Sequence, residues 1–142
     1  MKKIIMIAAI LLLGVFSLSF SSCKKQQQPA VKPVITLTEV GHENSKKIVA
    51  GAEHGLHLEA KIVAEGLIKR IDVEIHQENG GKSKIEKSFT EGKYIGVKNA
   101  DFHEHIAVPA DTPAGKYHLH LIVADKNGNT ATAESHIEVL SK

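Results

Sequence analysis

Nine histidines are the residues of this 142-residue chain whose type and spacing could do chemistry. Two pairs have the spacing His-x-His, at His103 and His105 and at His118 and His120. Alternate residues of a strand share one face and lie about 6.6–7 Å apart, so two such imidazoles can converge on one ion. Neutral imidazole is a ligand that suits Zn(II) and Cu(II). Metal binding is therefore the first hypothesis, although a single histidine on a solvent face needs no partner.

Alternating apolar and polar residues indicate the elements that would carry these histidines. A period of two is typical of strands, and no segment has a helical period with helix caps. Strands are expected at residues 34–40, 56–64, 68–77, 83–90, 102–108, 116–124 and 130–140. The pattern predicts an all-β domain over residues 34–142, built as an antiparallel β-sandwich of about seven strands.

The last third of the chain carries the clearest signal of fold. Residues 108–140 resemble the E, F and G strands of bacterial immunoglobulin-like domains, with Tyr117 at the place of the corner tyrosine. In those domains the ring enters the core and the hydroxyl bonds backbone upstream. Asn127-Gly128 suits a tight hairpin between the last two strands. We therefore expect an immunoglobulin-like sandwich in which Tyr117 is structural.

The predicted hairpin brings histidines of different strands together. A turn centred on Asn127 pairs residues whose numbers sum to about 254, which sets His118 opposite His136 and His120 opposite Glu134. Residues 68–77 should flank the other side of residues 116–124. No short turn fixes the register between these two strands, so the position of His76 is the least constrained. The first candidate site, for copper or zinc, consists of His76, His118, His120, His136 and Glu134.

A second candidate site is expected on the other sheet. Its members come from strands 56–64 and 102–108, which are neighbours in this fold class. Strand parity turns His103 and His105 outward but turns Glu104 toward the core, so a bulge or burial of Glu104 near a strand end is expected. His42 lies in a loop and has no predicted partner. The candidate ligands are His54, His57, His103 and His105.

The N-terminal residues predict export. Lys2 and Lys3 precede an apolar stretch over residues 4–16, and small residues lead to Cys23, an order that resembles a lipobox. The apolar stretch is shorter than the roughly 20 residues of a membrane-spanning helix. We expect residues 1–22 to be a lipoprotein signal peptide and residues 23–33 to hold the lipidated Cys23 and a flexible tether. The alternative is a plain secretory signal beside an incidental cysteine.

Lipidation would place the protein in the cell envelope, held to a membrane by its N-terminal lipid. In similar lipoproteins an acidic patch after the cysteine accompanies surface export, and here the patch is Lys24-Lys25. The outer membrane facing the periplasm is therefore the expected location. Cys23 is the only cysteine, so the domain has no internal disulfide and must be stabilised by its core alone.

Charge and motifs exclude several functions. Without the lysines at positions 2, 3, 24, 25 and 32, 13 Lys and Arg remain against 16 Asp and Glu, so the domain has no basic footprint for nucleic acid. The sequence has no nucleophile elbow, His-Glu-x-x-His motif or phosphate loop. We expect a protein that is neither an enzyme nor a nucleic-acid binder.

Several motifs together resemble one family. They are Gly41-His42, His54-Gly55-Leu56-His57, Asp101-Phe102-His103-Glu104-His105 and Tyr117-His118-Leu119-His120. They resemble small, histidine-rich, immunoglobulin-like lipoproteins of Bacteroidetes, a family catalogued as a domain of unknown function. The resemblance covers nearly all of residues 34–140, and it implies the fold and the lipid anchor but no established activity.

Three functions remain open. The leading hypothesis is a lipid-anchored periplasmic binding protein that captures copper or zinc through a surface histidine cluster. The alternative is a structural or adhesive module that meets another envelope protein through a sheet face or edge. A third is pH sensing, because clustered imidazoles repel one another once they are protonated.

Overall fold

The structure is a computed structural model that describes residues 30–142. The predicted signal peptide, Cys23 and most of the predicted tether lie outside the described residues. Eight strands and two short 3-10 turns make up the domain. In chain order they are β1 (Val34–Val40), η1 (His42–Asn44), β2 (Lys47–Val49), β3 (Leu56–Val63), β4 (Ile68–Gln77), η2 (Glu78–Gly80), β5 (Lys84–Phe89), β6 (Asn99–Ile106), β7 (Gly115–Asp125) and β8 (Thr130–Leu140).

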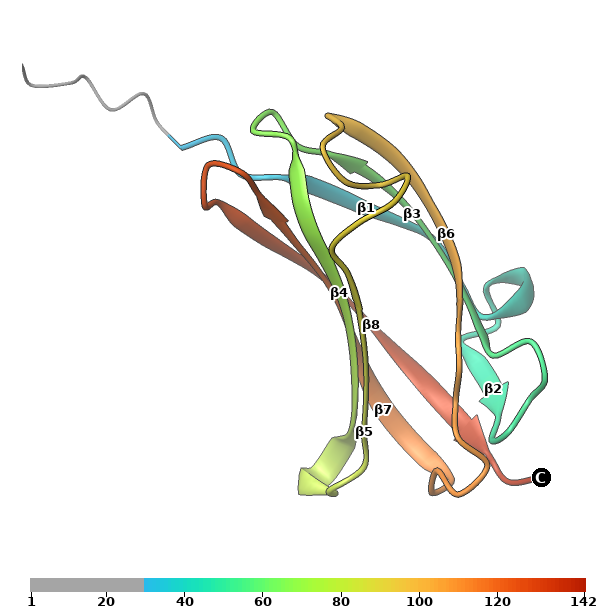
Figure 1. Ribbon diagram of the computed structural model, residues 1–142. Coiled ribbons are helices and arrows are strands. Elements are labelled where there is room, and N and C mark those ends of the chain that lie inside the picture. The colour runs from blue at the N-terminus through green and yellow to red at the C-terminus, as the bar shows by residue number, and fades with distance from the viewer. Residues whose placement is uncertain (1–29) are drawn as a thin grey trace, which may run out of the picture.

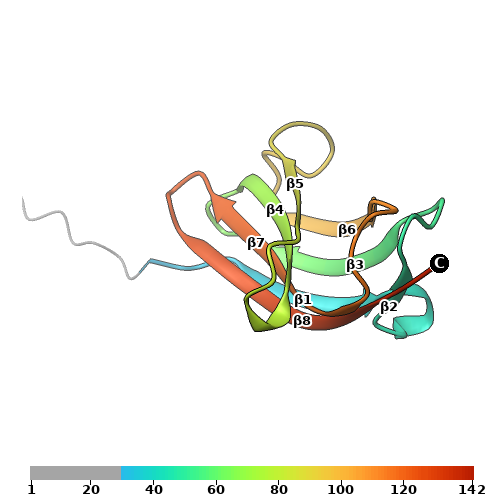
Figure 2. The same cartoon turned by 90° about the horizontal axis from the view of Figure 1, so that it is seen from below.

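The strands form two packed sheets. One sheet has the order β1-β3-β6 and the other the order β2-β8-β7-β4-β5. Figure 1 shows the two layers, and Figure 2 shows the segment between β5 and β6 arching from one sheet to the other. The predicted immunoglobulin-like β-sandwich is confirmed, with eight strands where about seven were expected. Within residues 30–142 no helix is long and apolar enough to cross a membrane.

The unexpected strand is β2, which explains the difference in strand number. After β1 the chain crosses to the other sheet at Gly41, whose φ is +72°, and a Cβ added there would lie 2.9 Å from Ser45 Oγ. Only glycine adopts this conformation easily. The chain then pairs in parallel with the end of β8, Ile48 opposite Val139. Three residues are too few to show a strand period, and this parallel pair departs from the all-antiparallel expectation.

The core lies between the sheets and follows the predicted alternation. On β7 Tyr117, Leu119, Leu121 and Val123 are all fully buried. Inward-facing residues of β3, β4 and β6 pack against them, among them Leu58, Ile62, Ile71, Val73, Ile75 and Phe102. Tyr117 donates a hydrogen bond from its hydroxyl to the Pro113 carbonyl at 2.7 Å, as expected of a corner tyrosine.

A tight turn joins β7 to β8 and is held by one buried carboxylate. Asp125, only 1% exposed, accepts hydrogen bonds from the backbone N–H groups of Asn127 at 2.9 Å and Asn129 at 2.8 Å. The Asn129 side chain donates a further bond to Asp125 at 2.9 Å. Gly128 takes the positive φ of +86° that the turn needs. These contacts set the pairing of the two longest strands.

Glu104 shows how the strand accommodates an inward-facing acid. The register of β3 against β6 is continuous from Leu56–Ile106 to Val63–Asn99, so there is no bulge. The Glu104 carboxylate is half-buried and accepts a hydrogen bond from the Tyr94 hydroxyl at 2.7 Å. Lys93 Nζ lies 3.8 Å from the same oxygen. Of the two expected solutions, a bulge is not seen, and Glu104 is instead partly buried two residues before the end of β6.

The corner tyrosine gives a direct test of the fold. Truncating a buried aromatic costs ~3–5 kcal/mol against a total stability of ~5–15 kcal/mol, so Tyr117→Ala should severely destabilise the domain. Tyr117→Phe keeps the ring and leaves the Pro113 carbonyl without its donor, so it should cost only about 0.5–1.5 kcal/mol. Urea denaturation of the three proteins measures both effects. A Tyr117→Ala variant as stable as the wild type would contradict this account.

Candidate metal centres

Four imidazoles lie together on the outer face of the five-stranded sheet. This group, the β7 cluster, consists of His76 on β4, His118 and His120 on β7 and His136 on β8. His118 is directly opposite His136 on one side and His76 on the other. His120 is opposite Glu134, so the β7–β8 register is the one predicted from the turn. All four point outward because their neighbours along each strand fill the core.

The rings of the β7 cluster are in mutual contact. His76 and His120 are stacked with a centroid separation of 5.0 Å and an interplanar angle of 13°, and their Nε2 atoms are 3.0 Å apart. The His118 ring lies 5.2 Å from that of His76 and 4.8 Å from that of His136. Except for the exposed His136, these side chains are half-buried. The cluster therefore spans three hydrogen-bonded strands without a gap.

Carboxylates orient two of these rings. Glu134 Oε1 lies 3.3 Å from His120 Nδ1, and Glu78 Oε1 lies 2.7 Å from His136 Nδ1. A carboxylate accepts the Nδ1–H of a neutral imidazole, which leaves Nε2 as a lone pair. His120 Nε2 is the atom that faces His76. With this tautomer His120 Nε2 accepts the hydrogen bond from His76 Nε2, and a carboxylate at Nδ1 is an arrangement that metal-binding histidines commonly use.

Glu78 is a member that the sequence analysis did not identify. It lies in η2 directly after β4, and its carboxylate forms a group with His118 and His136 whose ligand atoms are within 4.8 Å of one another. The hydrogen bond from His136 lowers the pKa of Glu78 more strongly than burial raises it, and the charges of His118, His136 and Lys116 lower it a little further. Glu78 is therefore a carboxylate at neutral pH. Glu78 lies just beyond the strand expected at residues 68–77, and no spacing in the sequence indicates where the side chain of a turn residue points.

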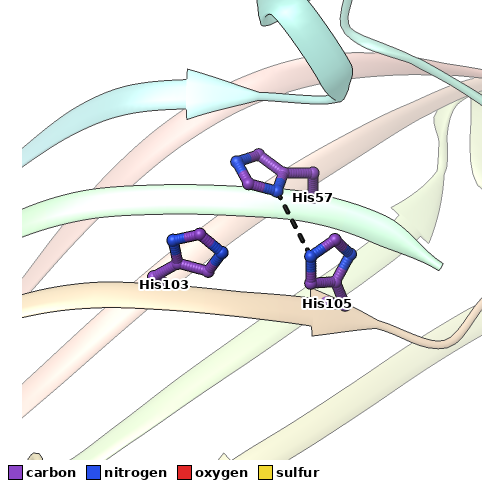
Figure 3. A group of neighbouring side chains, drawn as sticks. All are labelled: His57, His103 and His105. Carbon is purple, nitrogen blue, oxygen red and sulfur yellow. Dashed lines mark hydrogen bonds between the residues drawn. The ribbon is translucent and has the colours of Figure 1, made fainter. Parts of the chain in front are cut away.

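A second group lies on the outer face of the three-stranded sheet. The β3–β6 cluster consists of His57 on β3 and of His103 and His105 on β6. One ring nitrogen from each lies within 4.8 Å of the other two, and His57 Nδ1 is 3.4 Å from His105 Nε2. Figure 3 shows the three rings gathered over the two strands, with the hydrogen bond between His57 and His105 dashed. The predicted pairing of these strands therefore does bring their imidazoles together.

Two carboxylates border the β3–β6 cluster. Glu59 Oε1 lies 2.9 Å from His103 Nδ1 and 3.3 Å from His57 Nε2. Glu39 Oε2, on β1, lies 3.7 Å from His57 Nε2. The shared face of His57 and Glu59 was visible in the strand alternation. Glu39 was not predictable, because an irregularity between Leu37 and Glu39 shifts the β1–β3 register and places it beside Glu59.

The remaining two histidines lie outside both clusters. His54 precedes β3 in an exposed turn, and His42 lies in η1 with its side chain 88% exposed. Both line a cavity of about 360 Å³ that also borders His57 and His105. His54, predicted as a ligand of the second site, is thus near the cluster but does not belong to the three-imidazole group. His42 Nε2 is 4.0 Å from Glu43 Oε1 in its own turn.

Both clusters offer the donors of a transition-metal site. Neutral imidazoles with nearby carboxylates suit Zn(II), Cu(II) and related ions, and the carboxylates offset the charge of a dication. With metal–nitrogen bonds of about 2.0–2.1 Å, nitrogens 3.0 Å apart subtend an angle of about 95° at the ion. Nitrogens 3.4 Å apart subtend about 110°. On both faces, therefore, the closest pair of ring nitrogens is near enough for one ion to contact both.

Comparison with known proteins places the domain in a family. No curated protein sequence matches this chain. Among solved structures it is similar to a superoxide reductase (neelaredoxin) from Ignicoccus hospitalis, with 11% identity, a TM-score of 0.42, and coverage of 78% of this chain and 81% of that one. A family model, described as a domain of unknown function (DUF4625), matches residues 21–140. The chain belongs to this DUF4625 family.

Proposed function

We propose that this protein is a lipid-anchored envelope protein that binds copper or zinc through the β7 cluster. The observation that carries the proposal is the contact of four imidazoles on three adjacent strands, with the Nε2 atoms of His76 and His120 3.0 Å apart. Its ligands are His76, His118, His120 and His136, with Glu78 as a further ligand or orienting group and Glu134 behind His120.

The sheet supports binding because it positions the ligands in advance. Each ligand-bearing strand is hydrogen-bonded to the next, and the inward-facing neighbours Tyr117, Leu119 and Ile137 are buried. An ion would therefore order side chains only, not backbone. Ordering the backbone costs about 1–2 kcal/mol per residue, so binding to a sheet that is already formed avoids this free-energy cost.

The charges around the cluster also favour a divalent cation. Glu78 and Glu134 each place an oxygen within 3.3 Å of a histidine nitrogen. The charge of Lys116 lowers the pKa of Glu78, and Lys84 lies directly opposite His76 on β5. Both lysine side chains are exposed, so they can turn away from the cluster. Two carboxylates beside neutral imidazoles balance the charge of Zn(II) or Cu(II), and imidazole with carboxylate is a donor set typical of both ions.

The anchor would keep this site near a membrane. Acylated Cys23 would be followed by ten residues before β1 starts at Val34. At a maximum of about 3.3–3.6 Å per residue, this tether reaches roughly 35 Å. The domain would then capture ions within a short distance of the membrane surface. Lys24-Lys25 in place of an acidic patch supports the periplasmic side of the outer membrane.

Metal titration tests the binding site. The full chain, purified in detergent with an affinity tag that contains no histidine, should show saturable binding of Cu(II) or Zn(II) by calorimetry. Its melting temperature should rise with the ion and return with chelator. Binding should weaken steeply below about pH 6, because only neutral imidazole coordinates. His118→Ala and His136→Ala should each abolish this site.

Two controls make the titration specific. His42→Ala removes an exposed histidine of η1 and should leave binding at the β7 cluster unchanged. His103→Ala combined with His105→Ala should also spare it, because both lie on the opposite sheet. Binding that is no stronger than for scattered surface imidazoles would reject the proposal. If binding is lost in the variant with His103→Ala and His105→Ala but retained in His118→Ala, the ion binds on the three-stranded sheet and the proposal is wrong.

Membrane partitioning tests the anchor. In a host that processes lipoproteins, the wild type should fractionate with membranes and enter the detergent phase. Cys23→Ala should remain an unprocessed precursor or become soluble, because the thiol that carries the lipid is gone. Phase separation followed by immunoblotting measures the difference. Equal partitioning of the two proteins would show that Cys23 does not anchor the chain.

A further inference from the structure

The outer face of the three-stranded sheet carries a cluster that the proposed function does not use. In the β3–β6 cluster, the facing pairs His57–His105 and Glu59–His103 follow one another along the sheet. His57 has a side chain only 16% exposed, whereas His103 is 55% exposed. The cluster thus has a shielded side at His57 and an open side toward solvent.

One carboxylate oxygen orients two of the three imidazoles. Glu59 Oε1 contacts His103 Nδ1 at 2.9 Å and His57 Nε2 at 3.3 Å. Accepting these N–H groups leaves His57 Nδ1 and His103 Nε2 as lone pairs. His57 Nδ1 is the atom that lies 3.4 Å from His105 Nε2. The side of His57 that carries its lone pair therefore faces the other imidazole, and its N–H side faces the acids.

The nitrogen spacing matches a tetrahedral ion. Two ligands of a tetrahedral Zn(II) with bonds of about 2.0–2.1 Å are about 3.3–3.4 Å apart. The His57–His105 separation of 3.4 Å agrees with this. A ring nitrogen of His103 lies within 4.8 Å of a ring nitrogen of each of the other two histidines. The His103 side chain is exposed, so it can rotate to become the third ligand of the ion. The fourth position faces solvent, where water would coordinate.

From this arrangement we propose that the β3–β6 cluster is a second, independent metal site, one that takes Zn(II) on three imidazoles with Glu59 and Glu39 as its orienting carboxylates. It goes beyond the proposed function and does not depend on it. The two clusters lie on outer faces of sheets about 10 Å apart, with the core between them, so they cannot share an ion. His54 lines the neighbouring cavity and is not a ligand of this site.

Stoichiometry with separate variants tests the second site. The full chain in detergent, with a tag free of histidine, should bind two Zn(II) ions by calorimetry. The His118→Ala/His136→Ala variant should bind one, and Co(II) added to it should give the intense visible bands of tetrahedral coordination. Adding His57→Ala and His105→Ala should remove this last ion. In the wild type, the ring signals of His57, His103 and His105 should shift together in an NMR titration with Zn(II).

Glu59 distinguishes a positioned site from a chance cluster. In the His118→Ala/His136→Ala background, Glu59→Gln should weaken Zn(II) binding about 10-fold or more, the usual effect of losing an orienting carboxylate. Asp101→Asn is the matched control. Asp101 is an exposed acid opposite Lys61 on the same face of the sheet, and its substitution removes one negative charge, as Glu59→Gln does. The control should leave the affinity unchanged. Equal weakening in both would indicate a general charge effect and overturn the assigned role of Glu59.

The outcomes separate the two sites. If the His118→Ala/His136→Ala variant binds no Zn(II) while the wild type binds one ion, the second site is rejected and the β7 cluster stands. If that variant binds one ion, and the ion still binds after His57→Ala and His105→Ala are added, the ion lies elsewhere and the second site is also rejected. If the wild type binds one ion that only His57→Ala/His105→Ala removes, the second site stands and the β7 cluster fails. The ring signals identify the ligands even where a variant does not fold.

Discussion

The turn at residues 125–129 decides which imidazoles of the larger sheet meet. A strand has a side-chain period of two, so a slip of one residue between β7 and β8 would turn His136, the one histidine of β8, toward the core. Asp125 opposes this slip with its hydrogen bonds to Asn127 and Asn129. Burial raises the pKa of Asp125, but the hydrogen bonds from Asn129, Asn127 and Gly128 together outweigh it and lower the pKa. The turn therefore gains stability above the ordinary pKa of the acid and loses it as pH falls through the lowered value.

The two faces use one solution to the same problem. An imidazole alone on a sheet can rotate and can take either tautomer, and both freedoms weaken metal binding. On the larger sheet Glu134 and Glu78 each hold the Nδ1 side of a ring, and on the smaller sheet Glu59 alone holds two rings. Glu134 contacts one ring only, whereas Glu59 and Glu78 each place one oxygen near two rings, so a single carboxylate can fix the orientation of more than one imidazole.

Sequence alternation and the β7–β8 turn were enough to predict the fold and most of the first cluster. The short turn fixes one register, and that register sets His118 opposite His136. Features that depend on irregular backbone were not predictable. The irregularity before Glu39 and the 3-10 turn at Glu78 place two carboxylates by local conformation, which has no period in the sequence. Glu59 is different, because it lies two residues after His57 on a regular strand, and strand alternation alone places both side chains on one face.

The residues that stabilise the sandwich are distinct from the residues of the two histidine clusters. Inward-facing residues such as Tyr117 and Leu119 are fully buried, while the histidines between them face outward and contact one another and acids. Removing an outward imidazole therefore leaves no cavity in the core, and the main destabilising mechanism of core substitutions does not apply. An ion on either face would link strands that are already hydrogen-bonded, so its contribution to stability comes from mass action on the folded state rather than from forming the sheet. Because the side chains alternate, the outward-facing positions are not needed to pack the core, and both clusters consist of residues at such positions.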